Sequence, residues 1–296
     1  MKKVLITGGT GLIGKRLSFL LASRGYEVRI LSRNDSSNSV YKTFVWNVKA
    51  QYINDNAFKD LNHVIHLAGA GIADKRWSEK RKKEIINSRV DSTNLLYATV
   101  KRLQTPLQSF ISASATGFYG SFTTQTTFKE TDKAATDFLG KVCRLWEKSI
   151  FQFNKEKIRT VAFRTGIVLA KNGGALKKMK TPIISPLGDG KQYMPWIHID
   201  DLCELYIKAI EDTNFKGAYN AVSTEYQSNI SFSIALAKIQ KRLFIPIGAP
   251  KFILKLIFGE MSTIILNGSK VSASKIKQTG FKFKFETLED SLKNLI

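Results

Sequence analysis

Residues 3–14 read KVLITGGTGLIG and decide the fold. The apolar run KVLIT is typical of a buried β-strand, and the glycines after it predict a tight turn into a helix. Glycines at this spacing let the backbone approach a pyrophosphate, whose charge the free N–H groups and positive dipole of the helix N-terminus stabilise. We therefore expect the turn to bind a dinucleotide through Gly8, Thr10, Gly11, Leu12, Ile13 and Gly14.

Apolar strands and helical segments alternate over the first 170 residues. The predicted strands cover residues 3–9, 27–33, 44–46, 63–69, 109–116 and 159–170. The predicted helices cover about 12–25, 78–102 and 137–155. Such alternation predicts a parallel sheet wound by right-handed crossovers. The expected fold class is α/β, with a doubly wound parallel-sheet NAD(P)-binding Rossmann domain and a smaller C-terminal α+β substrate domain.

Beyond about residue 170 the alternation ends. The segment GDGKQYMPWIHIDD (188–201) is predicted to be a loop that feeds a helix over 202–212, with Asp200 or Asp201 as its N-cap. GAYNAVS (217–223) is expected to return to the sheet as a strand, and FKFKF (281–285) alternates like a half-exposed strand. The predicted domains are a Rossmann domain over 1–169 joined by 196–225, and a small substrate or lid domain over 170–195 and 226–296.

The end of the second predicted strand bears on the choice of dinucleotide. An acid there would bind the ribose 2′-hydroxyl of NAD, but the chain reads LSRN over 31–34, with no acid before Asp35. Ser32 and Arg33 are suited to hold a 2′-phosphate, the arginine through charge-assisted hydrogen bonds. NADP is therefore favoured over NAD. Alternatively, Arg33 stacks on the adenine, which would permit either cofactor.

Several longer motifs occur in order along the chain. They are ITGGTGLIG, HLAGAGIADKRWSEKRKKEIINSRVDSTNLL, SASATGFYG, DFLGKVCRLWE, FRTGIVLAKNGGAL, LGDGKQYMPWIHIDDL and APKFILKLIFGEMSTIILNGSKV. Together they resemble the atypical, epimerase-like subgroup of extended short-chain dehydrogenases/reductases, described as NAD(P)-dependent nucleotide-sugar epimerases. The resemblance covers nearly the whole chain and implies an NADP-binding Rossmann domain.

The resemblance also implies particular cofactor contacts. It carries them onto Ser32 and Arg33, and further onto Leu67, Ala68, Glu84, Arg89 and Val168. From the residues alone, Glu84 and Arg89 would be surface charges, and His66 would be a hydrogen-bonded core histidine.

The catalytic end is incomplete. Related dehydrogenases use a serine or threonine together with a tyrosine and, four residues on, a lysine. Ser114 lies at the end of the fifth predicted strand and is the candidate serine, but DFLGKVCRLWE (137–147) offers neither tyrosine nor lysine in register. Tyr119 is a candidate displaced acid. Two readings stay open: an oxidoreductase or epimerase acting on a small polar, nucleotide-sugar-like substrate, and a non-catalytic NADP-binding sensor or assembly protein.

Composition restricts the other function classes. Lysine and arginine outnumber acids 46 to 24, but outside KRWSEKRKKE (75–84) the basic residues are scattered, so nucleic acid is not expected as a partner. The most apolar stretch, 252–266, is interrupted by charges and predicts an amphipathic helix pair covering a core, so no membrane partner is expected. With two distant cysteines, no secretory signal and three scattered histidines, the chain is expected to be cytoplasmic and to hold no metal. The sequence does not determine an oligomeric state.

Overall fold

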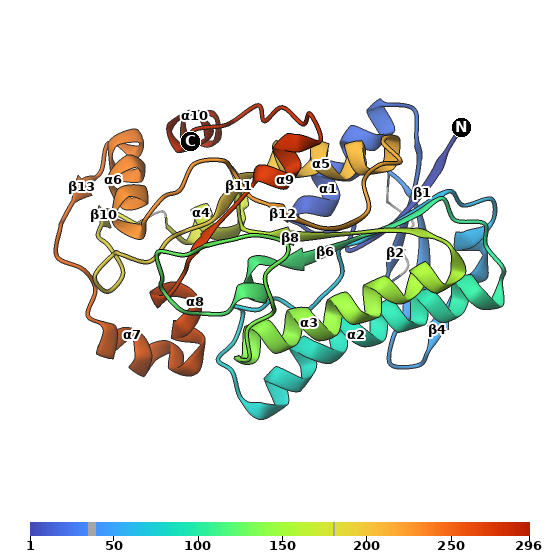
Figure 1. The fold of residues 1–296 in the computed structure, drawn as a ribbon, viewed down its shortest axis with the longest axis horizontal. Coiled ribbons are helices and arrows are strands. Elements are labelled where there is room, and N and C mark those ends of the chain that lie inside the picture. The colour runs from blue at the N-terminus through green and yellow to red at the C-terminus, as the bar shows by residue number, and fades with distance from the viewer. Residues whose placement is uncertain (35–39, 180) are drawn as a thin grey trace.

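The structure is a computed structural model that describes residues 1–34, 40–179 and 181–296. Asp35, the first acid after the second predicted strand, lies outside the described residues. One large sheet, covered on both faces by helices, organises the described chain (Figure 1).

The large sheet has the strand order β12-β8-β6-β5-β1-β2-β3-β4. Its strands are β1 (Lys3–Thr7), β2 (Glu27–Ser32), β3 (Lys42–Asn47), β4 (Tyr52–Ile53), β5 (His63–His66), β6 (Ser109–Ala115), β8 (Arg159–Thr165) and β12 (Gly217–Ala221). All neighbouring pairs are parallel except β3 with β4. β1 lies between β2 and β5, so the winding reverses there and a ligand crevice is expected beyond the carboxyl ends of these strands.

Helices cover both faces of this sheet. α1 (Leu12–Ser23) and α5 (Ile199–Glu211) lie on one face, and α2 (Glu79–Arg102) and α3 (Phe138–Phe151) lie on the other (Figure 1). Successive side chains of a strand point to opposite faces, and β1 accordingly divides between two cores. Val4 and Ile6 pack with α1 and α5, whereas Leu5 packs with α2 and α3. These features confirm the predicted doubly wound α/β fold.

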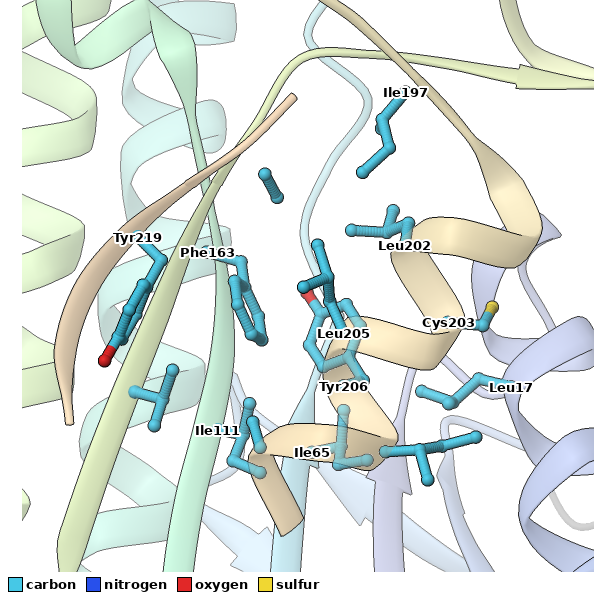
Figure 2. Packing of buried hydrophobic residues seen from close by; sticks show 14 of the residues in the cluster. Leu17, Ile65, Ile111, Phe163, Ile197, Leu202, Cys203, Leu205, Tyr206 and Tyr219 are labelled. Atoms are coloured by element: carbon cyan, nitrogen blue, oxygen red, sulfur yellow. The ribbon is translucent and has the colours of Figure 1, made fainter. Parts of the chain in front are cut away.

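Figure 2 shows the core beneath α5. Leu202, Leu205 and Tyr206 of α5 meet Ile65 and other apolar residues of the sheet. Each of these side chains is fully removed from water. Their burial fixes α5 against the strands and thereby positions the loop that precedes α5.

Most of the remaining elements are short and lie in the C-terminal half. The strands are β7 (Thr127–Phe128), β9 (Ile167–Ala170), β10 (Ile183–Ile184), β11 (Trp196–His198), β13 (Leu243–Phe244) and β14 (Lys270–Val271). The helices are α4 (Gly174–Lys178), α6 (Asn229–Gln240), α7 (Lys251–Phe258), α8 (Thr263–Leu266), α9 (Ser274–Gln278) and α10 (Leu288–Leu295). Single 3-10 turns form η1 (Asp55–Phe58), η2 (Thr116–Tyr119), η3 (Gln152–Glu156) and η4 (Gly259–Ser262).

A third core joins α6 and α10 around Trp196, Phe232 and Leu292. The expected return of 217–221 to the sheet is observed as β12, while the division into two domains stays a prediction.

The single strand predicted over 159–170 is wrong. It is two strands, β8 and β9, separated at Gly166. β9 leaves the large sheet and pairs with β11, which lies inside the predicted loop over 188–201. At the break the chain passes close to Pro195, where a side chain would not fit: a Cβ on Gly166 would lie 2.8 Å from the Pro195 carbonyl carbon.

Two predictions around α5 are also wrong. His198, not Asp200 or Asp201, is the N-cap, since its Nδ1 accepts a hydrogen bond from the Asp200 N–H at 3.0 Å. Asp201 instead accepts the backbone N–H groups of Lys284 and Phe285 at 2.7 and 3.0 Å. Because a carboxylate takes these donors, residues 281–285 form no strand.

The helix pair predicted over 252–266 is present as α7 and α8 but covers a core only in part. Leu254 of α7 is buried, whereas Phe252 and Leu256 are 71% and 75% exposed. The expectation that these helices hide their apolar residues is therefore corrected. Within the described chain, no helix has the length and apolar character needed to cross a bilayer.

Candidate functional site

The glycine turn after β1 is shaped for close approach of a ligand to the backbone. Gly8 has φ +71°, a conformation that favours glycine, and its carbonyl accepts the Gly11 N–H at 3.0 Å. A Cβ on Gly14 would meet the Gly8 carbonyl oxygen and lie 2.6 Å from the Gly9 Cα. The turn opens directly into α1, whose N-cap Gly11 has no side chain to cover the first N–H groups. Backbone donors at this helix end are the groups that bind a pyrophosphate.

The end of β5 lies against this turn. The N–H groups of Leu67 and Ala68 both donate to Thr7 Oγ1 at 3.1 Å. A Cβ on Gly8 would be 3.1 Å from the Ala68 nitrogen, so the two segments touch. The structure thus places Leu67 and Ala68, two predicted cofactor contacts, beside the glycine turn, where the winding of the sheet reverses.

His66 holds these strand ends in place. Its Nδ1 lies 2.7 Å from Thr7 Oγ1 and its Nε2 lies 3.1 Å from Ser92 Oγ of α2. Burial lowers the pKa of His66 to about 3, so the ring is neutral at neutral pH. His66 is a hydrogen-bonded core histidine, as the residues indicated.

Ser32 and Arg33 follow at the end of β2, on the other side of β1. Ser32 is half-buried and its Oγ accepts the Asn34 N–H at 3.3 Å. The Arg33 side chain is exposed. This position beside the glycine turn is where the adenosine end of a dinucleotide is read in such sheets.

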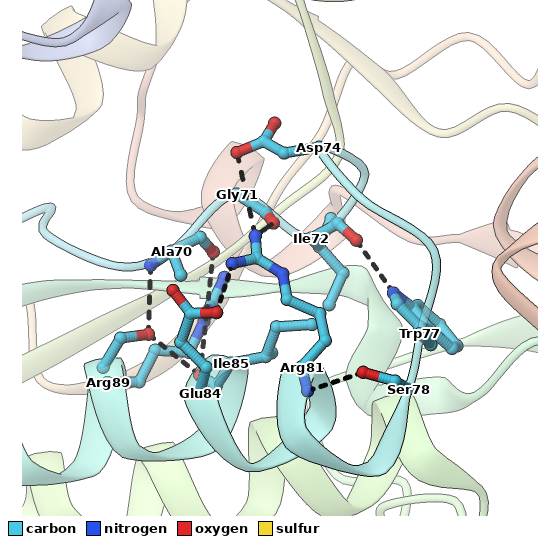
Figure 3. Close-up of polar contacts among 11 residues, drawn as sticks. Ala70, Gly71, Ile72, Asp74, Trp77, Ser78, Arg81, Glu84, Ile85 and Arg89 are labelled. Carbon is cyan, nitrogen blue, oxygen red and sulfur yellow. Dashed lines mark hydrogen bonds and ion pairs between the residues drawn. The ribbon is translucent and has the colours of Figure 1, made fainter.

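Figure 3 shows the loop after β5 and the start of α2. Arg89 Nη1 donates to the carbonyls of Ala70 and Ile85 at 3.0 and 2.9 Å. Among the described residues no carboxylate forms an ion pair with Arg89, and burial lowers the pKa of its guanidinium. A half-buried cation without a counter-ion fits a polar or anionic ligand at this edge.

Glu84 is placed differently. Its carboxylate is exposed and pairs with Arg81 Nη1 at 2.7 Å, and the arginine lowers the pKa of the carboxyl (Figure 3). Arg81 also donates to the Gly71 carbonyl at 2.5 Å. As placed, Glu84 braces the loop through Arg81, and its direct cofactor contact stays a prediction.

Val168 lies on β9, where it pairs with Ile197 of β11. It is half-buried, and the turn that follows β9 packs on α1: a Cβ on Gly173 would lie 2.9 Å from Leu12 Cδ1. The segments that carry the predicted cofactor contacts therefore surround one edge of the sheet, although they come from five separate parts of the chain.

The predicted catalytic residues Ser114 and Tyr119 lie beside a buried ion pair, Arg164–Glu147, that the sequence did not predict. Arg164 of β8 donates from Nε and Nη2 to the two carboxylate oxygens of Glu147, each at 2.8 Å. Ser114 Oγ donates to Glu147 Oε1 at 2.7 Å. All three side chains are buried. The hint available in the sequence was a charged residue inside the apolar run of VAFRTG (161–166).

Tyr119 belongs to the same network. Its hydroxyl accepts from Arg164 Nη1 at 3.0 Å and donates to Asn220 Oδ1 at 2.6 Å. The side chain is buried, and burial raises the pKa of Tyr119 to about 12. With both sides of the hydroxyl engaged, the prediction of Tyr119 as a displaced acid gains no geometric support.

α3 packs Leu139 and Cys143 against η2, while the absence of a tyrosine–lysine pair from this helix stays a prediction. A Cβ added to Gly117 of η2 would lie 3.3 Å from Leu139 Cβ and 3.7 Å from Cys143 Sγ. The turn therefore packs directly on the helix. Burial raises the pKa of the Cys143 thiol to about 12, which makes it a poor nucleophile. Lys141 is exposed. Among the described residues, no group of three or more His, Cys, Asp or Glu side chains is clustered to hold a metal.

Comparisons with known proteins agree with this geometry. Residues 4–139 match the NAD dependent epimerase/dehydratase family, and residues 249–295 match a domain of unknown function, DUF1731. Epimerase family protein SSP1921 of Staphylococcus saprophyticus is 33% identical over 306 residues, covering 100% of both chains. Human epimerase family protein SDR39U1 (isoform 2), solved with NADPH, is similar with TM-score 0.87 and 28% identity, covering 99% of this chain and 98% of the human one. A nucleoside-diphosphate sugar epimerase from Corynebacterium glutamicum is similar with TM-score 0.80 and 26% identity, covering 99% of this chain and 58% of that one.

Proposed function

We propose an NADP-dependent function from the premise that this chain belongs to the epimerase family of extended short-chain dehydrogenases/reductases, as its full-length 33% identity to the staphylococcal protein shows. The observation that carries the proposal is the glycine turn, where a Cβ on Gly14 would lie 2.6 Å from the Gly9 Cα. A backbone packed this tightly at a helix N-terminus lets a pyrophosphate approach the free N–H groups of the helix.

NADP(H) is the form we assign. Ser32 and Arg33 offer a hydroxyl and a guanidinium at the end of β2, where an acid would select NAD. The similarity to the human protein solved with NADPH supports this choice. Arg89 adds a half-buried cation beside the Ala70 carbonyl, ready to meet a polar group of the bound cofactor. Bound NADPH would donate a hydride to the substrate, and bound NADP+ would accept one from it.

Arg33→Asp tests the cofactor assignment. We expect the Kd for NADPH to rise by about 100-fold or more, because a charge-assisted contact is replaced by repulsion between two negative charges. The Kd for NADH should change by less than about fivefold, since NADH carries no 2′-phosphate. Titration of both nucleotides by fluorescence measures the ratio. An equal loss for NADH and NADPH would show that Arg33 contacts the adenine instead.

We further propose that the chain is an oxidoreductase or epimerase acting on a small polar substrate of the nucleotide-sugar class. The similarity to the Corynebacterium nucleoside-diphosphate sugar epimerase supports this class. Ser114 at the carboxyl end of β6 is the residue we assign to the substrate oxygen. Its hydroxyl donates to Glu147 at 2.7 Å, which leaves the oxygen lone pairs to accept a hydrogen bond from a substrate hydroxyl that reaches this buried residue. The usual tyrosine–lysine pair plays no part in this scheme.

One observation favours a second, non-catalytic function. The hydroxyls of the two predicted catalytic residues, Ser114 and Tyr119, already donate hydrogen bonds to Glu147 and Asn220. A site in which both of these hydroxyls are engaged is compatible with an NADP sensor that binds without turnover.

A substrate screen separates the two functions. Wild-type protein with NADPH is mixed with nucleotide sugars and small carbonyl compounds, and both loss of reduced nicotinamide and sugar interconversion are followed. Enzymatic function predicts turnover that falls about 100-fold or more in Ser114→Ala while the Kd for NADPH is unchanged. Tight NADPH binding with no turnover on any compound favours the sensor. The predicted cytoplasmic location stays a prediction.

A further inference from the structure

α7 carries an exposed apolar face. The α7 face consists of Phe252, Ile253, Leu256 and Ile257, which are 71%, 40%, 75% and 54% exposed. At about 100° per residue these side chains span an arc of about 140° on one side of the helix. Four large apolar side chains exposed on eight consecutive residues are a concentrated patch, in contrast to single apolar side chains scattered over a surface.

The opposite side of α7 is anchored, so the exposed face is held in place by the fold. Leu254 is buried. Lys251 Nζ pairs with Asp189 at 2.9 Å, and Glu260, in the turn η4 after the helix, pairs with Lys82 of α2 at 2.6 Å. α7 lies at the periphery of the molecule, away from the large sheet (Figure 1). The helix therefore cannot bury its outer face by rolling inward without breaking these contacts.

The charges around the face identify what would cover it. Lys255 lies on one flank of the α7 face, KFILKLIF contains no acid, and the whole chain carries a formal charge of +22, whereas the charge of Lys251 is paired with Asp189. A second copy would bring the same lysine and the same net charge to the interface, which opposes self-association. An anionic surface is complementary: lysine stems lie along apolar material while their ammonium groups reach the phosphates.

The length of the helix favours a lipid surface over a protein groove. Protein grooves recognise an amphipathic helix through anchors spaced over two or more turns, at i, i+3, i+4 and i+7. α7 has eight residues and four apolar side chains in adjacent pairs, a shape that needs no matching pockets in order to insert among acyl chains.

We propose that α7 docks this protein on an anionic lipid bilayer, with the α7 face inserted at the headgroup boundary and Lys255 against the phosphates. This is surface attachment and involves no spanning segment, so the proposal differs from the sequence-based expectation only in giving the chain a membrane surface as a partner. It is independent of the nucleotide site.

Vesicle flotation tests the proposal with the full chain. We expect the protein to float with phosphatidylcholine vesicles that contain phosphatidylglycerol at low salt, and to stay unbound with phosphatidylcholine alone. Phe252→Ser/Leu256→Ser should weaken binding by at least about tenfold, because two inserting side chains are lost. Phe19→Ser/Tyr52→Ser is the matched control: these side chains are 57% and 51% exposed on other elements, and their loss should leave binding within about twofold.

Two charge-reversal variants complete the design. Lys255→Glu should weaken vesicle binding about fivefold or more, whereas Lys141→Glu, an equal charge change on α3, should have little effect. Because every substituted side chain is at the surface, melting temperature and NADPH affinity should match wild type and confirm that each variant is folded. Three results would overturn the proposal: no binding to anionic vesicles, equal binding by the α7 and control variants, or a dimer in light scattering that only the α7 variant dissociates. The second would assign binding to net charge, and the third would place a second copy on the face.

Discussion

Gly14→Ala is expected to abolish measurable NADPH binding, with a Kd at least about 100-fold above wild type. The added Cβ would meet the Gly8 carbonyl oxygen and lie 2.6 Å from the Gly9 Cα, so backbone, not a flexible side chain, has to move. Either the turn opens or α1 shifts along its axis. A displacement of about 1 Å in a preorganised site is enough for a loss of this size.

The substitution should also lower the free energy of unfolding, by about 1–3 kcal/mol, because the strained contact is present without ligand. Gly25→Ala is the matched control at the other end of α1. Gly25 also has a positive φ, +81°, but a Cβ there has open space, so the variant should lose about 1 kcal/mol of stability and keep its NADPH affinity. Isothermal titration and urea unfolding of both variants measure the two quantities. If Gly14→Ala bound NADPH as tightly as Gly25→Ala, the glycine turn would not be the pyrophosphate site.

The large sheet and the cofactor edge were predictable from the sequence because their signals are local. A strand, a glycine turn and a helix follow one another within twelve residues, and β1, β5 and β6 contain the consecutive apolar residues VLI, VI and FI. The family resemblance implied Leu67, Ala68 and Val168 as cofactor contacts. The structure brings their segments to the glycine turn and the start of α1. Their contact with cofactor stays a prediction.

The chemistry end was less predictable because its contacts are long-range. Glu147 looked like a polar position on a helix, and only the fold shows that it meets Arg164 and Ser114 inside the protein. His198 became a helix cap and Asp201 a ligand for backbone N–H groups of the C-terminal segment, partners that no local pattern reveals. The exposure of α7 likewise depends on what lies opposite it, since an amphipathic pattern does not say whether its apolar side is covered.

Glu147→Ala is expected to lower the free energy of unfolding by about 3–5 kcal/mol, the largest loss of stability among the changes considered. Removing the carboxylate leaves the Arg164 guanidinium buried without its counter-ion and leaves the Ser114 hydroxyl without its acceptor. The three residues are at most 5% exposed, so water cannot replace the lost partners without opening the core. Urea unfolding followed by circular dichroism measures the loss, and a change below about 1 kcal/mol would contradict the placement of the pair in a dry core.

The double variant Glu147→Leu/Arg164→Met separates ion-pair burial from packing. Replacing both charges by apolar side chains of similar length removes the pair together with its desolvation cost, so stability should return to within about 2 kcal/mol of wild type even if Glu147→Ala does not fold. The same variant bears on function, since Ser114 loses the acceptor that fixes its hydroxyl while the glycine turn is untouched. NADPH affinity should therefore stay within about twofold of wild type. Any turnover that depends on an oriented Ser114 should fall about as far as in Ser114→Ala, because the ion pair acts on the substrate only by positioning that hydroxyl.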